Sequence, residues 1–335
     1  MHRWITVLFT AIAAALLIGC GAQPQQSAED AYSEFRKAIR EIETSEEKTA
    51  LCEDFLTRFP ESEHTGSLAG AVAYYRGEAM EDPAGVVEYL DGLLAKIEDP
   101  DMRFGVQLAQ FPSSHKTGQA TDLGGIVTDL ETHRALTFSE HLDVSEVAAT
   151  HELWSLAEAQ AAGASTVATA EAFRSDYPDT DLSDEEIAAK ADNRSVMAAT
   201  NHGWALAHLD RETEALEVFE TAAPLSQSNY LGVPSTELFA YWGRTALAQG
   251  DAERALELLG PTAVLGDNDE AFEAYRNAYI SVHEDEAGFE DFLWSARQDL
   301  AKVVDDFELP DYEGILRKLG DTRGNVVFLS FWFPT

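Results

Sequence analysis

The sequence predicts a mainly α-helical protein, built as an array of helical hairpins and followed by a short β-containing segment at its C-terminal end. Three observations support this fold class. Apolar residues recur at helical spacing in runs that capping residues and prolines bound. Two helix–turn–helix stretches repeat with an offset of 40 residues, from Gly203 to Gly243 and from Ala215 to Ala255. The run Val326–Trp332 is almost entirely β-branched, aromatic or aliphatic, which is typical of a buried strand.

Composition restricts the possible partners. The chain has 335 residues, 45% of them hydrophobic, which is enough for proper cores. It carries 23 Lys and Arg against 60 Asp and Glu, for a formal net charge of −37. Such a surface repels phosphate backbones, so nucleic acid is excluded as a partner. The acidity fits a saline habitat and a cationic partner equally well.

The N-terminal residues have the pattern of an export signal. Two basic residues precede the stretch Trp4–Ile18, which is apolar apart from two threonines and too short to span a membrane. Leu17-Ile18-Gly19-Cys20 resembles a bacterial lipobox. The resemblance implies that Cys20 is the lipid attachment site of an envelope lipoprotein facing the periplasm or exterior, with residues 1–19 as signal peptide and 20–26 as tether. The alternative is an ordinary secretory signal with an incidental cysteine.

Only one other cysteine, Cys52, occurs in the sequence. If Cys20 is acylated, Cys52 has no disulfide partner. Its neighbours have the pattern of a helix with Leu51, Phe55, Leu56 and Phe59 facing inward, so we expect a buried thiol without a redox role.

A series of helices, joined by turns and loops, is expected between residues 27 and 304. The first begins at the cap Ser27, the second runs from about Ser45 to Phe59, and Asp82-Pro83 and Asp99-Pro100 start the fourth and fifth. The fifth should end near Phe111-Pro112, since proline interrupts helices. The other expected elements are a third helix around Leu68–Tyr75, a surface loop over 113–121, helices over 126–136, 144–161 and 167–177, and a last helical piece over 271–304.

The repeat is clearest between Met197 and Gly260. Gly203, Ala215 and Phe219 fall at the small and aromatic positions of a helical hairpin, and Trp242-Gly243 and Ala255 recur later. These stretches resemble tetratricopeptide (TPR) units, in which small residues let two antiparallel helices approach closely. The resemblance implies a TPR-like helical domain over residues 27–304, an α-solenoid that binds protein partners. Because the offset exceeds the usual length of such a unit, residues 224–234 should loop out.

The C-terminal residues carry a second resemblance. The spacings Phe307-x-Leu309-x-Asp311-x-x-Gly314, Gly324-x-Val326-Val327 and Phe331-Trp332-x-Pro334 resemble the start of thioredoxin-like proteins of the TlpA type and of the AhpC/TSA redoxin group. The resemblance implies that residues 305–335 begin an α/β thioredoxin-like domain. Phe331, Trp332 and Pro334 would shape the approach to a Cys-x-x-Cys site. No such cysteines occur here, so we expect a longer gene product that continues past Thr335, and no catalytic residue or activity in this chain.

Three functions follow from these patterns. The first is an envelope lipoprotein of the thiol–disulfide oxidoreductase class, acting on disulfide-bearing substrate proteins. The second is a non-enzymatic TPR-like scaffold that binds envelope proteins. The third is a peroxiredoxin-type thiol peroxidase. None requires a cofactor or a metal.

Other candidate constellations are weak. His151-Glu152-Leu153-Trp154-Ser155 begins like a zinc-protease helix, but Ser155 stands where the second histidine ligand belongs. The spacings of His133, His141 and His151 do not stack on one helix face, so we expect surface or core histidines. Six aromatics are predicted to pack between helices, and they are Phe239, Tyr241, Trp242, Phe272, Tyr275 and Tyr279.

Overall fold

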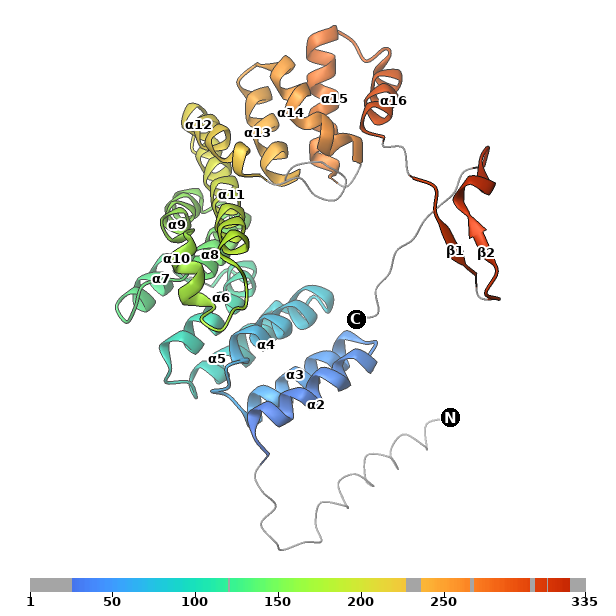
Figure 1. The fold of residues 1–335 in the computed structure, drawn as a ribbon. Coiled ribbons are helices and arrows are strands. Elements are labelled where there is room, and N and C mark those ends of the chain that lie inside the picture. Colours follow the sequence, from blue (N-terminus) through green and yellow to red (C-terminus); the bar gives the residue numbers. More distant parts are fainter. Residues whose placement is uncertain are drawn as a thin grey trace, which may run out of the picture. The chain divides into compact units, whose positions relative to one another are not determined.

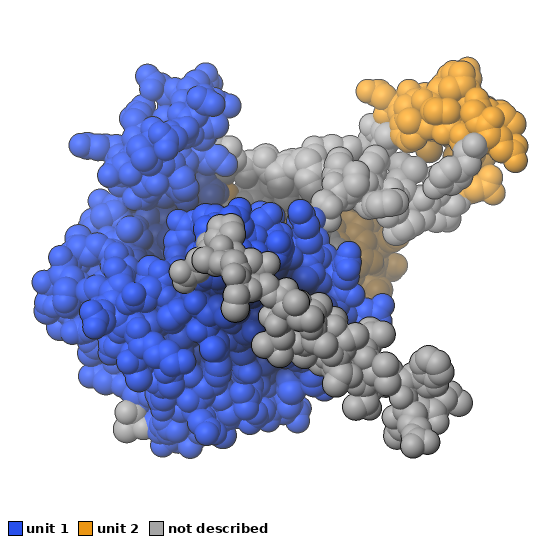
Figure 2. Space-filling view, turned by 90° about the horizontal axis from the view of Figure 1, so that it is seen from below, with its two compact units in different colours: residues 1–205 blue, residues 206–335 orange. Residues whose placement is uncertain are grey.

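The computed structural model describes residues 26–119, 121–226, 236–265, 268–301, 305–311 and 313–325. The chain divides into two compact units, residues 1–205 and 206–335 (Figure 2). Helices make up nearly all of the regular structure in the described part (Figure 1), which confirms the predicted mainly α fold. None of the described helices combines the length and apolar character needed to cross a bilayer.

Unit 1 is a succession of helices joined by short turns. They are α2 (Ala28–Glu41), α3 (Ser45–Arg58), α4 (Thr65–Val72), the π-helix η1 (Ala73–Ala79), α5 (Pro83–Leu94), α6 (Pro100–Lys116), α7 (Leu123–Glu131), α8 (Phe138–Thr150), α9 (Trp154–Val167) and α10 (Ala170–Asp176). The next helix, α11 (Asp184–His208), begins in unit 1 and ends just inside unit 2.

The described part of unit 2 contains five further α-helices and a small sheet. Its elements are α12 (Glu212–Ala222), the 3-10 turn η2 (Ala223–Leu225), α13 (Thr236–Ala248), α14 (Ala252–Leu265), α15 (Asp269–His283), α16 (Phe289–Leu300), β1 (Glu308–Pro310), β2 (Leu316–Lys318) and the 3-10 turn η3 (Leu319–Thr322). Most of the segment predicted to loop out, residues 227–235, lies outside the described part.

Local chemistry fixes several helix starts where the sequence places them. The side chains of Ser27, Asp82 and Asp99 accept hydrogen bonds from backbone N–H groups of the first turns of α2, α5 and α6. Free N–H groups at a helix start need such acceptors, so each cap sets its boundary. At α8, Thr137 and Glu140 form a complete capping box.

The predicted end of the fifth helix at Phe111-Pro112 is wrong, and so is the first part of the loop predicted over 113–121. Helix α6 continues through Pro112 to Lys116. Ser113 and Ser114 are both buried, so packing of this last turn outweighs the missing N–H of the proline.

The helix predicted over 144–161 is in fact two helices. Thr150 ends α8, Trp154 begins α9, and between them Glu152 adopts a left-handed conformation with φ of 59°. The residue after it, Leu153, donates its backbone N–H to the carbonyl of Ala148 at 2.8 Å, which closes the turn. The two helices then pack against each other, with Ser145 Oγ of α8 donating to the Ala157 carbonyl of α9.

The helical piece predicted over 271–304 is likewise a hairpin. Glu284 and Gly288 have φ of 67° and 85°, and they separate α15 from α16. Phe289 at the start of α16 packs against the rings of Tyr275 and Tyr279 of α15. The apolar residues therefore face a partner helix of the same segment, and a single long helix would leave them exposed.

The predicted repeat corresponds to two similar turns. Asp210 follows α11 with φ of 57°, and Gly250, 40 positions later, follows α13 with φ of 85°. The backbone N–H of Arg211 donates to the Leu206 carbonyl, and that of Asp251 to the Ala246 carbonyl. Gly243 of α13 lies directly against Leu259 of α14, as the small-residue rule predicts.

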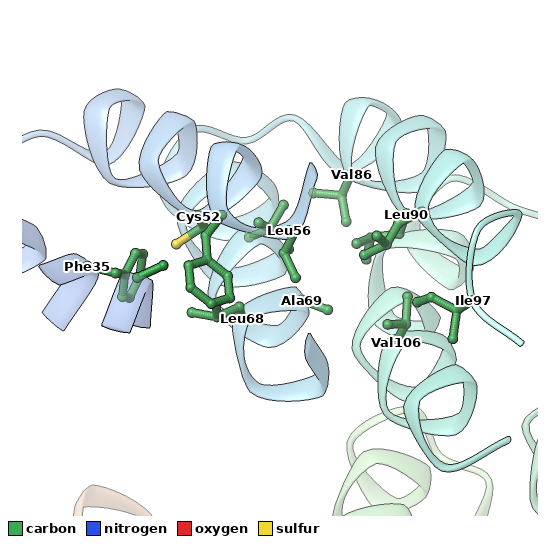
Figure 3. Packing of buried hydrophobic residues seen from close by; sticks show 13 residues of the cluster. Phe35, Cys52, Leu56, Leu68, Ala69, Val86, Leu90, Ile97 and Val106 are labelled. Carbon is green, nitrogen blue, oxygen red and sulfur yellow. The ribbon is translucent and has the colours of Figure 1, made fainter. Parts of the chain in front are cut away.

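The N-terminal core joins α2 through α6. Figure 3 shows Phe35, Cys52, Leu56 and Leu68 among its members, converging from successive helices. Phe55 contacts the rings of Tyr32, Phe35 and Phe59, so aromatic packing links α2 to α3. The inward positions predicted at Phe55 and Leu56 are confirmed, at 2% and 0% exposure.

A buried arginine links three helices elsewhere in unit 1. The side chain of Arg194 in α11 is 8% exposed and pairs with Asp176 at 2.8 Å. Its guanidinium carbon lies 4.7 to 5.7 Å from the ring centroids of Phe138, Phe173 and Tyr177. Three aromatic faces and one carboxylate thus replace the water that this charge loses.

The C-terminal segment contains an antiparallel hairpin that pairs Glu308 with Lys318 and Pro310 with Leu316. Asp311 Oδ1 accepts the backbone N–H groups of Glu313 and Ile315, and Gly314 has φ of 78°. The Asp-x-x-Gly spacing in the sequence is therefore the signature of a turn. The strand predicted over 326–332 lies outside the described residues.

Candidate functional site

The described residues of unit 1 form an acidic groove with a volume of about 720 Å³. It lies along α4, η1, α6 and α8. Its lining residues are Gly66, Ser67, Gly70, Ala73, Tyr74, Glu78, Asp101, Phe104, Gly105, Leu108, Ala109, Pro112, Ser113, Glu140, Asp143, Glu146 and Val147.

Small residues create the hollow. Gly66 of α4 and Gly105 of α6 face each other so closely that a Cβ on Gly105 would lie 3.1 Å from the Gly66 Cα. The absence of side chains lets the two helix backbones touch there. Apolar groups of Phe104, Leu108 and Val147 form part of the lining, so a bound segment would meet an apolar surface.

A π-helix forms one wall. Helix α4 passes without a break into η1, in which the backbone N–H of Met80 donates to the Tyr75 carbonyl five residues back. This wider helix carries Tyr74, which is 61% exposed, and Glu78 into the groove lining. π-helical segments are frequent at functional sites.

Carboxylates form the charged part of the groove lining. Arg134 donates from Nε to Asp101 Oδ1 at 2.8 Å and from both terminal nitrogens to Glu140. Burial raises the pKa of Glu140, but the hydrogen bonds from Arg134 and Thr137 outweigh it and lower the pKa below its usual value. Glu140 is therefore firmly ionised, and it is fixed in place by a bidentate pair.

Asp143 is the carboxylate best placed to gain from a bound cation. Its side chain reaches solvent in the groove. Partial loss of hydration there raises the pKa of Asp143, and the negative charge of Glu140 one turn earlier raises it further. A positive group bound here would relieve that repulsion. Among the described residues that line the groove, none is lysine or arginine.

The residues predicted for lipid attachment and for the thioredoxin-like entrance are Cys20, Phe331, Trp332 and Pro334. All four lie outside the described residues, so these assignments remain predictions.

Cys52 is a buried thiol, as expected. It is 0% exposed within the α2 to α6 core (Figure 3), and burial, with the charge of Glu53, raises its pKa to about 11. Because the thiolate is the reactive form, we expect alkylation of folded protein at pH 8 to be at least about 100-fold slower than in urea. Mass spectrometry after iodoacetamide treatment measures this rate. Equal labelling of Cys52 in both conditions would contradict its burial.

The histidines named in the sequence have separate partners. His133 Nδ1 lies 3.0 Å from Thr132 Oγ1, and His141 Nδ1 lies 2.7 Å from Gln160 Oε1. His151 is at the turn after α8, with its ring 4.6 Å from that of His115. The first three residues of the rejected zinc-protease pattern, 151–153, thus form a turn where a helix would be required.

Of the six aromatics predicted to pack between helices, three are buried and the other three are partly exposed. Trp242, Tyr275 and Tyr279 are 7%, 2% and 6% exposed. The guanidinium of Arg254 lies over the Trp242 ring at 4.9 Å. These rings belong to the packing of unit 2, in agreement with the prediction.

Sequence reasoning missed the groove. Two signals for it exist: Glu140, Asp143 and Glu146 recur every third residue along α8, and Gly66 and Gly70 are one turn apart on α4. Each pattern is common on solvated helices. Only the crossing of α4, α6 and α8 brings the two patterns together.

Comparisons with known proteins give a structural similarity and no family. No protein-family model matches the sequence, and no curated protein matches it. Among solved structures, a tetratricopeptide repeat protein from Parabacteroides merdae ATCC 43184 is similar over 76% of this chain and 100% of that chain, at 10% sequence identity and a TM-score of 0.32. The helical hairpins of the chain itself therefore define its fold class.

Proposed function

We propose that the chain is a protein-binding scaffold, and that the groove along α4, η1, α6 and α8 holds an extended, lysine- or arginine-rich segment of a partner protein. The observation that carries the proposal is the lining itself, which combines an apolar surface with five carboxylate residues and no basic residue among those described.

The chemistry of the groove suits long cationic side chains. Lysine and arginine pack their aliphatic stems on apolar surface while the charged group remains near water or a carboxylate. Phe104 and Leu108 offer such a surface, and Asp143 offers the charge. Glu78 also lines the groove, where it pairs with Lys116 at 3.8 Å. The net charge of −37 adds long-range attraction, which increases association rates at low salt.

A library of extended peptides that differ only in charge tests the proposal. We expect the full chain to bind the Lys- and Arg-rich members and to release them as salt rises, since screening shortens the range of the attraction. Asp143→Lys should weaken binding about 10-fold or more, because it places a like charge in the groove. Binding should also weaken on acidification, because protonation of Asp143 begins at a higher pH than for an ordinary aspartate.

A matched control is Asp179→Lys, which makes the same charge change at an exposed position of unit 1 outside the groove lining. It should leave peptide binding nearly unchanged. If the chain prefers acidic or neutral peptides, or if Asp143→Lys and Asp179→Lys have equal effects, the groove is not the binding site.

The location is proposed on the sequence alone. Lipidation at Cys20 would place this scaffold on the bacterial envelope membrane. Metabolic labelling with an alkyne fatty acid tests the lipidation: the natural chain should be labelled and Cys20→Ser should not.

A second candidate is the thiol–disulfide oxidoreductase function of a longer product. It is favoured by the pairing of β1 with β2, which flank the Asp311 to Gly314 spacing of the thioredoxin resemblance. The coding sequence after Thr335 distinguishes the candidates: a Cys-x-x-Cys supports the oxidoreductase, and its absence supports the scaffold alone. The chain itself should not reduce insulin.

A further inference from the structure

Two glutamates, Glu29 and Glu63, lie close to one ring nitrogen of His64 near the start of α2 in unit 1. His64 Nε2 lies 3.3 Å from Glu29 Oε1 and 3.7 Å from Glu63 Oε1. Glu29 belongs to the first turn of α2, and His64 caps the start of α4. Of the described residues, these three form the one group of metal-ligating side chains whose ligand atoms lie within 4.8 Å of one another.

The histidine is held firmly in this position. Its ring stacks on Tyr32 with a centroid distance of 3.4 Å, and its backbone N–H donates to Ser62 Oγ at 3.0 Å. The Nε2 atom is inaccessible to solvent and makes no hydrogen bond of acceptable geometry. A buried polar atom without a hydrogen bond is costly, so it requires a partner.

A proton on Nε2 engages one carboxylate, whereas a divalent cation engages both. A single Nε2–H can point at one of the two carboxylates, and the other, being exposed, would be left to solvent. An ion between them binds all three atoms. Two ligands of a tetrahedral zinc ion, each at about 2.1 Å, lie about 3.4 Å apart, close to both separations observed around His64.

The ligand types select the ion. Magnesium and calcium prefer oxygen ligands only, whereas an imidazole with two carboxylates suits zinc and related first-row ions. Glu29 and Glu63 are 68% and 74% exposed, so solvent reaches the carboxylate side of the site, and water from that side would complete the coordination of an ion. We propose that Glu29, Glu63 and His64 bind a divalent transition-metal ion of the zinc class, joining α2 to the start of α4. This site is independent of the acidic groove.

Titration of the metal-free full chain with Zn²⁺, followed by calorimetry, tests the proposal, and Co²⁺ absorption reports an imidazole ligand. We expect one ion per chain at this site and a rise in melting temperature of about 5 °C at an ion concentration 100 times Kd. Glu29→Gln with Glu63→Gln keeps the side-chain shapes but removes both anionic ligands. It should weaken binding at least about 10-fold.

The matched control is Glu41→Gln with Glu43→Gln, which makes the same charge change at exposed positions at the other end of α2. Cys20 and all nine histidines are identical in these proteins, so other zinc ligands cancel in the comparison. His64→Gln should abolish the Co²⁺ signal of this site. The proposal is overturned if Zn²⁺ binds equally to all variants, which would indicate an adventitious ion only, or if no ion binds.

Discussion

Gly243→Val is expected to destabilise unit 2 by about 3 kcal/mol. A Cβ at this position would lie 2.5 Å from Leu259 Cγ and 3.3 Å from Leu258 Cβ. Leu259 is fully buried, so neither it nor the backbone of α14 can move aside without losing other contacts. Valine adds two methyl groups beyond that Cβ, and its χ1 is restricted in a helix.

Amide hydrogen exchange in α13 and α14 measures this loss of stability within the two helices themselves. A loss of 3 kcal/mol corresponds to exchange about 100-fold faster in those helices. The matched control is Gly260→Ala in α14, where an added Cβ meets only Tyr275 at 3.7 Å, an ordinary contact. That change should alter stability by about 1 kcal/mol or less, because the greater helix propensity of alanine is opposed by crowding between its Cβ and the ring of Pro261, the next residue. Unchanged exchange in Gly243→Val would show that the helices are not in close contact there.

Phe55→Ala is expected to cost about 4 kcal/mol. The ring is 2% exposed and contacts three other aromatic rings, from Tyr32, Phe35 and Phe59. Its removal takes away the transfer free energy of the ring and leaves a cavity that rigid neighbours cannot fill. Because Tyr32 also stacks on His64, the loss extends to the proposed metal site.

Urea denaturation of the full chain, followed by circular dichroism, measures this loss. Phe55→Leu should retain more than half of the free energy of unfolding that Phe55→Ala loses, since leucine fills much of the same volume. Tyr74→Ala, which removes a ring that is 61% exposed, should change stability by about 0.5 kcal/mol or less. Similar losses for Phe55→Ala and Tyr74→Ala would contradict the proposed core.

The sequence predicted helices well where local chemistry determines them. Caps such as Ser27 and Asp82 act on N–H groups within the same turn, so their effect can be read from neighbouring residues. The breaks at Glu152 and Glu284 were not predicted, because each is a non-glycine residue in the left-handed region. Glutamate gives no local signal for such a turn, and packing of the following helix decides it.

The candidate sites show the same division. The carboxylates of α8 and the glycines of α4 and α6 are visible in the sequence, but their meeting in one groove depends on how the three helices cross. Glu29 and His64 are 35 positions apart, and no short-range motif connects them.

The sequence by itself determined the mainly helical fold class, the 40-residue repeat, several helix starts and the acidic surface. These features depend on interactions within a few residues or on composition alone. Only the tertiary structure decided where Pro112 is tolerated, where helices divide at non-glycine residues, and which charged side chains share a groove or converge on His64. Those outcomes depend on contacts between residues far apart in the chain, which the hydrophobic pattern of any one segment does not specify.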